Sequence, residues 1–353
     1  MSRTDSRLPT VLGLSSAFPA RVLTQDELWH DPFARWYAGV PNAREVMAQT
    51  KVVRRHMAWD PRVELRARSR GTGDRMEAFE RFAVPLAEEA CGRALAGSER
   101  RRVGSFALAS CTGYAGPTPD LHVAHRLELS ATLRRTFVGH MGCYAAFNAL
   151  KVGLDAVAAR PDELALVGCV ELSSVQYRPE PATLEQAIIH ALFGDAAAAL
   201  VLGLAEPGAG PQVLATHTVQ VYGSAEHMIW TVLDDGFLMS LSPYVPFVLA
   251  GHVEAFVAAL CDRAGVDPSA VRHWGIHPGG PKIIDMIADR LAIPANRLAA
   301  TWRVLETRGN CSSTTILLIL EEIIKQDRPA PGDLGVLMAF GPGLTMEGAL
   351  VRF

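Results

Sequence analysis

The sequence has no large excess of charge of either sign. Its 353 residues include 34 Lys and Arg against 37 Asp and Glu, which gives a formal net charge of −3 at pH 7. A chain with this balance has no overall basic field to attract the phosphates of nucleic acid. We therefore expect no nucleic-acid partner.

Closely spaced cysteines are absent as well. No two of the six cysteines have the spacing of metal ligands or of a compact disulfide framework. We therefore expect no metal site, and a protein of a reducing compartment, which we take to be the cytoplasm. The six are Cys91, Cys111, Cys143, Cys169, Cys261 and Cys311.

Export and membrane signals are also missing. The N-terminal stretch MSRTDSRLPTVLGLSSAFPA lacks the charged and then apolar arrangement of a signal peptide. Charges, Gly and Pro interrupt every apolar run before it reaches the length of a membrane span. The composition, 49% hydrophobic and 20% charged, is typical of a soluble globular enzyme without a membrane partner.

What the sequence does contain is a regular alternation of apolar segments. Short runs rich in Val, Leu and Ala predict strands that are buried on both faces. Longer runs with apolar residues three and four positions apart predict helices. The alternation predicts an α/β protein. The predicted strands are 10–17, 103–113, 162–172, 196–205, 273–280 and 334–343, and the predicted helices are 75–97, 144–158, 244–265 and 312–326.

One segment divides the chain. AEPGAGPQ, residues 205–212, is rich in Gly and Pro and follows a predicted strand. A chain of 353 residues is long enough for two domains or one large duplicated domain. We expect residues 1–205 to form one half and residues 206–353 the other.

Cys143 lies in VGHMGCYAAFNALKVG, directly before a helical pattern. Gly142 permits a tight turn beside it. The thiol is either a small buried hydrophobic group or a nucleophile whose pKa is lowered by the N-terminus of the helix.

His277 lies in WGIHPGGPKIID, at the end of a predicted strand and before a glycine turn. It is either a hydrogen-bonded turn residue or a base facing a substrate channel. Asn310 lies in ETRGNCSSTTILLILEEI. This segment is either a helix cap formed by Ser312 or Ser313, or a turn that points the Asn310 amide at developing negative charge.

The stretch 44–75 is locally basic. It is either a solvated surface or an anion-docking rim for a substrate that carries phosphate.

Cys, His and Asn in this order, each at a strand-to-helix turn, resemble one enzyme family. GHMGCYAA, HALFGDAAAALVLG, GIHPGGPKIID, RVLETRGNCSSTTILLILEE and AFGPGLTMEGAL together are similar to segments of bacterial type III polyketide synthases, relatives of chalcone synthase. The resemblance extends from about residue 50 to the C-terminus. It rests mainly on GNxSS, HPGGP and FGPGLT, which are far apart and in the order of the family.

The resemblance implies the thiolase fold, a duplicated five-layer αβαβα arrangement, in a homodimer. It implies an acyltransferase that loads an acyl starter from a thioester onto Cys143. His277 is then the partner of the thiol and Asn310 a second donor to the enolate. Decarboxylative condensation with malonyl-CoA lengthens the chain, and the product cyclises to a pyrone, a resorcinol or a related aromatic compound. Coenzyme A thioesters are substrates, and no tightly bound cofactor is implied.

The resemblance also implies a set of cavity residues. Phe193 matches a phenylalanine that separates the acyl cavity from the coenzyme A tunnel. A second such phenylalanine is replaced by Met239, although Phe237 is only two residues away. The remaining cavity residues implied are Cys111, Thr112, Ser312, Gly341, Pro342 and Gly343.

Coenzyme A contacts are matched less well. The plant enzymes have basic residues before a KRRYM-like motif, which VRRHM matches in this sequence. At those positions this chain has Asn42, Glu45 and Gln49 instead. The nearby substitutes are Arg44, Lys51, Arg54 and Arg55, together with Gly279 and Lys282 of the HPGGPK segment. This departure leaves open an acyl carrier protein as the donor.

Three alternatives remain. A ketoacyl-carrier-protein synthase of type III has the same three residues but performs one condensation. A thiol hydrolase releases the acyl group to water. The third alternative is a non-catalytic protein of the thiolase fold, which would have no reason to keep the three residues.

Overall fold

A nine-stranded mixed sheet forms the centre of the computed structural model, which describes residues 7–65 and 70–353. The strands adjoin in the order β11 (Val271–Ile276), β12 (Leu334–Gly341), β13 (Thr345–Arg352), β8 (Gln212–Gln220), β1 (Leu8–Ala17), β7 (Asp195–Ala205), β6 (Leu164–Leu172), β4 (Val103–Ser110) and β5 (Arg134–Gly139).

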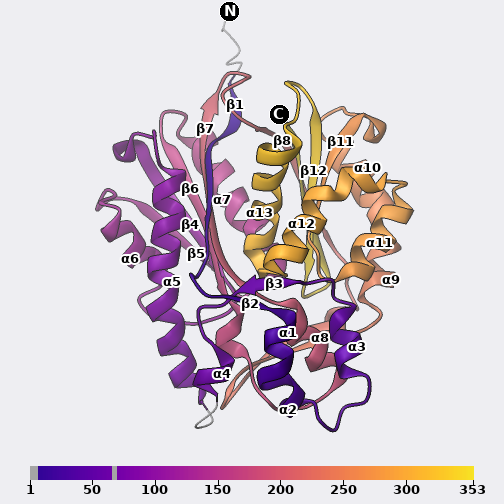
Figure 1. Ribbon diagram of the computed structural model, residues 1–353. Coiled ribbons are helices and arrows are strands. Elements are labelled where there is room, and N and C mark those ends of the chain that lie inside the picture. Colours follow the sequence, from indigo (N-terminus) through magenta and orange to yellow (C-terminus); the bar gives the residue numbers. More distant parts are fainter. Residues whose placement is uncertain (1–6, 66–69) are drawn as a thin grey trace, which may run out of the picture.

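The sheet divides at β1. This strand pairs with β7 over its whole length, from Leu8↔Ala205 to Ala17↔Ala197, but it pairs with β8 only at Thr10↔Gln212. β8 continues along β13 instead. The sheet therefore has an N-terminal part, from β1 to β5, and a C-terminal part, from β8 to β11, which face each other across a layer of helices (Figure 1).

The middle layer consists of α7 (Ala145–Ala159) and α13 (Thr315–Glu322). Leu150 of α7 and Ile319 of α13 belong to one hydrophobic cluster with Leu200 of the N-terminal part and Leu337 of the C-terminal part. α12 (Ala299–Arg308) packs beside α13. The two helices that follow Cys143 and Asn310 are thus buried together at the centre of the molecule.

Further helices cover both outer faces. α5 (Thr72–Ala94) and α6 (Pro119–Arg126) lie on the N-terminal part, and α10 (Val253–Asp262) and α11 (Pro281–Arg290) lie on the C-terminal part (Figure 1). In β7, Ala198 and Leu200 face the middle layer, whereas Ala199 and Val201 pack in the cluster of α5. This alternation explains the continuous apolar run, because both faces are buried. The predicted five-layer αβαβα arrangement is confirmed.

Shorter elements close one end of these layers, below the sheet in Figure 1. Phe33, Trp36 and Tyr37 form a cluster there with Tyr177 and Ala187. The elements are β2 (Val22–Thr24), α1 (Gln25–Leu28), η1 (Trp29–Phe33), α2 (Ala34–Trp36), α3 (Ala43–Ala48), β3 (Arg54–His56), α4 (Pro61–Glu64), α8 (Leu184–Leu192), β9 (Met228–Leu233), β10 (Gly236–Leu241) and α9 (Val245–Ala250).

The predicted elements differ from the observed ones mainly at breaks. The predicted helix 244–265 is interrupted at Gly251 and His252, between α9 and α10. The predicted helix 312–326 begins with a 3-10 turn, η8 (Ser312–Thr314), and ends in a π-helical turn, η9 (Ile323–Asp327). β8 and β13 were not predicted. Within the described residues, no helix is long and apolar enough to cross a membrane.

Candidate active site

Cys143 lies at the start of the middle layer. A 3-10 turn, η3 (Gly142–Tyr144), leads from β5 into α7, so the thiol precedes the helix N-terminus as predicted. Gly142 has a φ of 79°, and a Cβ there would lie 2.5 Å from Cδ of Pro342. The Tyr144 hydroxyl donates to the Pro342 carbonyl oxygen at 3.3 Å. Contact with the 341–343 loop therefore fixes the turn that carries the thiol.

His277 follows β11, and its backbone N–H donates to the Met338 carbonyl oxygen at 2.8 Å. Its side chain is 1% exposed, and neither ring nitrogen has a hydrogen-bond partner among the described residues. The alternative of a hydrogen-bonded turn histidine is therefore wrong. A buried imidazole with two free nitrogens is available to a bound molecule.

Asn310 is held by its main chain. Its N–H donates to the Leu192 carbonyl oxygen at 2.8 Å, and its carbonyl oxygen accepts from the Gly194 N–H at 3.0 Å. The side-chain Oδ1 accepts from the Ser312 N–H at 2.8 Å, which leaves the amide NH₂ for the cavity. The Ser312 hydroxyl contacts the Cys111 sulfur at 3.1 Å and Ser313 donates to Glu171 at 2.5 Å, and neither η8 nor α13 has a side-chain cap, so the capping alternative is wrong.

One small cavity of about 10 Å³ joins the three residues. Cys143, His277 and Asn310 all line it, although they come from η3, the end of β11 and the turn after α12. A neighbouring cavity of about 40 Å³ reaches the other side of the thiol. Three residues that are far apart in the sequence therefore line one cavity.

The two titratable groups of this site are both neutral at pH 7. Burial raises the pKa of the Cys143 thiol to about 12, against smaller lowering effects of hydrogen bonds from Ser312 and Asn310. Burial lowers the pKa of His277 to about 3. The predicted lowering of the thiol pKa is wrong, because desolvation outweighs the effect of the helix N-terminus.

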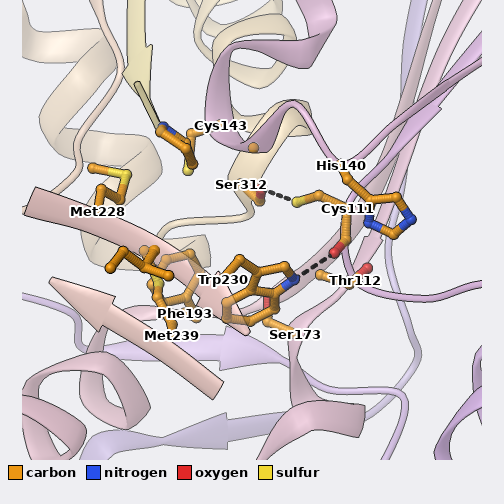
Figure 2. A pocket seen from close by; sticks show the side chains of 13 residues that line it. Cys111, Thr112, His140, Cys143, Ser173, Phe193, Met228, Trp230, Met239 and Ser312 are labelled. Carbon is orange, nitrogen blue, oxygen red and sulfur yellow. Dashed lines mark hydrogen bonds between the residues drawn. The ribbon is translucent and has the colours of Figure 1, made fainter. Parts of the chain in front are cut away.

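Most of the predicted cavity residues line the space around the thiol (Figure 2). Phe193 and Met239 border both cavities. Phe237 lines neither of these two cavities and borders only a further one, which Phe193 and Met239 also line, so Met239 and not Phe237 lies beside Phe193 at the thiol. The other predicted residues on the 40 Å³ cavity are Cys111, Thr112, Ser312 and Pro342.

Gly341 and Gly343 do not line these cavities but shape the loop behind Cys143. A Cβ at Gly341 would lie 2.7 Å from the Tyr144 ring, and one at Gly343 would lie 2.6 Å from Oγ1 of Thr345. Gly343 also has a φ of 133°, which side chains rarely tolerate. Gly341 therefore lets the Tyr144 ring pack against the loop, and Gly343 supplies a backbone conformation and a space that a side chain would not allow.

Glu171 was missed in the sequence. It is fully buried at the end of β6 and accepts hydrogen bonds from the Cys111 N–H at 3.0 Å and the Thr112 hydroxyl at 2.8 Å. Burial raises the pKa of this carboxyl. The available signal was a single acidic residue inside the apolar run LALVGCVEL, which no alternation explains.

Trp230 of β9 was missed as well. Its indole N–H donates to the Cys111 carbonyl oxygen at 2.8 Å (Figure 2). Its ring lies edge-on to Phe237, with centroids 6.0 Å apart. Trp230 borders both the 40 Å³ cavity and a further cavity of about 30 Å³ lined by Gln176 and His190. A tryptophan inside the short apolar run MIWTVL gave no signal of this position, because it is not distinguished from a core residue.

A wide mouth leads from the surface toward the thiol. It has a volume of about 780 Å³, and Lys51, Gly279 and Lys282 line it. Leu241 and Ile283 line both the mouth and the 10 Å³ cavity. The three predicted coenzyme A residues at this mouth are therefore brought together on the approach to Cys143.

The prediction that Arg55 binds coenzyme A is wrong. Arg55 is 0% exposed, because β3 turns its side chain inward. Arg54 is exposed on the same strand but does not line the mouth. Strand alternation separates these two neighbours.

Several arginines of the basic stretch 44–75 are paired with acidic neighbours. Arg62 contacts Asp60 at 2.9 Å and Arg70 contacts Glu64 at 3.0 Å. Residues 66–69 lie outside the described residues. The pairs favour a charge-balanced surface over an anion-docking rim for most of this stretch.

No metal site was found among the described residues. No group of three or more His, Cys, Asp or Glu side chains there is placed to hold a metal ion. All six cysteines are free and buried.

A cysteine before a helix N-terminus, with His and Asn around one cavity in a five-layer α/β molecule, defines the class of thiolase-fold enzymes. Family models described as chalcone and stilbene synthases, N-terminal domain and C-terminal domain, match residues 1–207 and 213–353. The chain belongs to the chalcone and stilbene synthase family, and it is a type III polyketide synthase.

Three similar proteins illustrate this membership. The alpha-pyrone synthesis polyketide synthase-like Pks18 of Mycobacterium tuberculosis is 35% identical over 359 residues, covering 96% of this chain and 89% of that protein. PKS-I of the brown alga Ectocarpus siliculosus superimposes with a TM-score of 0.92 at 26% identity, covering 99% of this chain and 100% of that one. CsyB in complex with CoA-SH gives a TM-score of 0.88 at 25% identity, covering 98% and 99%.

Proposed function

We propose that Cys143 carries the growing acyl chain of this polyketide synthase. The observation that supports this role is the convergence of Cys143, His277 and Asn310 on one cavity that adjoins the mouth. A neutral thiol beside a neutral imidazole can react once a thioester enters, because the imidazole accepts the thiol proton as the sulfur attacks. The new C–S bond replaces the bond to coenzyme A, which leaves with the proton from His277.

Chain extension follows on the acylated enzyme. The bond between the malonyl carboxylate and its methylene carbon breaks, carbon dioxide leaves, and the electron pair forms an enolate on the thioester. The imidazole N–H of His277 and the amide of Asn310 donate to the enolate oxygen, which stabilises the charge. The enolate carbon then attacks the acyl carbonyl, and Cys143 leaves as a thiolate. No redox step occurs in this sequence.

Coenzyme A thioesters are the proposed donors. Lys51 and Lys282 lie at the mouth, where their charges suit phosphate groups, and the glycine turn at Gly279 lets a narrow pantetheine arm approach the backbone. The complex of CsyB with CoA-SH supports the same class of ligand. An acyl carrier protein is the second donor that competition experiments should test.

The later steps and the assembly are proposed on the same basis. Successive extensions followed by cyclisation to a pyrone, a resorcinol or a related aromatic compound fit the alpha-pyrone relative. The family matches do not favour a synthase of single condensations. We propose a homodimer, which the outer edge of β5 at one end of the described sheet supports. We also propose that the chain has two halves, with the boundary in the connection between β7 and β8. Six free thiols support a reducing, cytoplasmic compartment.

Mass spectrometry of the purified protein tests the proposal. Incubation with acyl-CoA should add one acyl group to wild type and none to Cys143→Ala, while malonyl-CoA should yield products with more than one added two-carbon unit. Cys261→Ala is a matched control, since Cys261 is buried in α10 away from the cavities. Acylation of Cys143→Ala at wild-type level, or products with a single added unit, would contradict the proposal.

A further inference from the structure

Arg55 is a buried cation that the proposed reaction does not use. Its Nη1 donates to the main-chain carbonyl oxygens of His190 at 2.7 Å and Phe193 at 3.3 Å. Its Nη2 donates to the side-chain oxygen of Gln25. No carboxylate of the described residues forms an ion pair with it. Removing a guanidinium from water is costly, and here the two backbone carbonyl oxygens, the Gln25 side chain and the nearby Asp195 carboxyl offset that cost.

These two carbonyl groups lie where α8 ends. The last carbonyls of a helix have no partner within the helix, so other groups must satisfy them. The Tyr177 hydroxyl oxygen lies 2.7 Å from the His190 carbonyl oxygen and 2.8 Å from that of Phe193. Arg55 and Tyr177 therefore clamp the same two groups from two distant segments of the chain.

The opposite side of this segment contacts Asn310. Phe193 and Asn310 form a parallel β-bridge, with backbone bonds from Asn310 N–H to Leu192 and from Gly194 N–H to Asn310. A Cβ on Gly194 would lie 2.5 Å from the Arg308 carbonyl oxygen and 3.1 Å from Cβ of Arg55. The three segments pack without space between them, so a shift at β3 reaches the Asn310 turn.

We propose that Arg55 is a positioning residue that sets the places of Phe193 and Asn310 through the main chain. Arg55 contacts neither the Cys143 thiol nor the two cavities beside that thiol. The inference rests on the proposed function in one respect, the role of Asn310 as a donor to the enolate. A misplacement of about 1 Å in such a donor costs roughly 100-fold in rate. The guanidinium is suited to this task because its planar fork binds several acceptors in fixed directions.

The test compares Arg55→Lys with Arg101→Met, a control on the surface where the side chain is 84% exposed. Lysine keeps the charge but lacks the fork. We expect carbon dioxide release from malonyl-CoA to fall roughly 10- to 100-fold in Arg55→Lys. The rate of Cys143 alkylation by iodoacetamide should fall much less than carbon dioxide release, because contact with Pro342 holds the thiol turn separately and the Asn310 hydrogen bond has only a small effect on the thiol pKa. Equal falls in both rates, or no fall in either, would overturn the positioning role.

A second variant and a second measurement keep the test decisive. Tyr177→Phe removes one member of the clamp and retains the ring, so it should show the same selective loss, more weakly, even where Arg55→Lys does not fold. Crystal structures of wild type and the variants should show a displaced Phe193 carbonyl and Asn310 amide. A wild type that releases no carbon dioxide would refute the proposed function, whereas superimposable Asn310 turns would refute the role of Arg55.

Discussion

Replacing Asn310 with alanine should separate catalysis from folding. The substitution removes the side-chain amide, while the backbone bonds of residue 310 to Leu192 at 2.8 Å and to Gly194 at 3.0 Å remain. The turn should therefore stay in place. What the cavity loses is a donor beside the Cys143 thiol.

Loss of the Asn310 side chain should affect the barrier to decarboxylation and the free energy of unfolding by different amounts. Removing one preorganised donor to an enolate-like oxygen raises the barrier by about 3–4 kcal/mol, a fall of roughly 100- to 1,000-fold in the rate of decarboxylation. The Ser312 N–H, which now donates to Oδ1 at 2.8 Å, becomes an unsatisfied buried group. That change lowers the free energy of unfolding by about 1–3 kcal/mol.

The assay measures carbon dioxide release from malonyl-CoA, acyl loading of Cys143 by mass spectrometry, and urea unfolding. Asn296→Ala is the control, because Asn296 is exposed in the 3-10 turn η7 (Ala295–Leu298). We expect loading to persist in Asn310→Ala while decarboxylation is nearly lost. A folded Asn310→Ala protein that decarboxylates within about threefold of wild type would show that the amide does not stabilise the enolate.

Three further substitutions have defined outcomes. Trp230 borders both the cavity of about 40 Å³ and that of about 30 Å³, so Trp230→Ala should enlarge the space beside the thiol, and products from longer acyl starters should appear by mass spectrometry; an unchanged product series would contradict this expectation. Lys282→Ala at the mouth should raise KM for malonyl-CoA by about twofold to fivefold with kcat unchanged, and added salt should reduce the difference. Burial lowers the pKa of His190 to about 3, so the unfolded chain binds the proton first as pH falls below about 6.5. Wild type should therefore lose about 2 kcal/mol of unfolding free energy through this group between pH 7 and pH 5, and His190→Gln should lose less in urea titrations; equal losses would refute the linkage.

Strands buried on both faces were predictable from the sequence. β6 and β7 read as continuous apolar runs because helices cover both of their faces. β8 and β13 gave weaker patterns for opposite reasons. β8 is half-buried along most of its length, whereas β13 contains a buried Glu347 that pairs with Lys151 at 2.7 Å. A charge inside an apolar strand hides that strand unless its partner, 196 positions away, is known.

The site was predictable where its residues mark the ends of elements. Cys143 and Asn310 each directly follow a glycine, His277 lies between a strand end and a glycine turn, and the family motifs include all three. Arg55 was not predictable, because a buried arginine and an exposed one look the same in a basic stretch. The neutral states of Cys143 and His277 were equally hidden, since desolvation depends on distant segments that close over the cavity.

The bridge between Phe193 and Asn310 joins the backbones of two residues that line the same cavity, so the shape of the cavity and the position of the Asn310 amide should change together. Phe193 directly precedes β7, whereas Asn310 follows α12, far along the chain. A substitution that shifts the backbone at Phe193 should therefore also displace the Asn310 amide, the proposed donor to the enolate. Variants with altered selectivity should thus arise first as slow enzymes, and compensating changes should accumulate in the surrounding clamp.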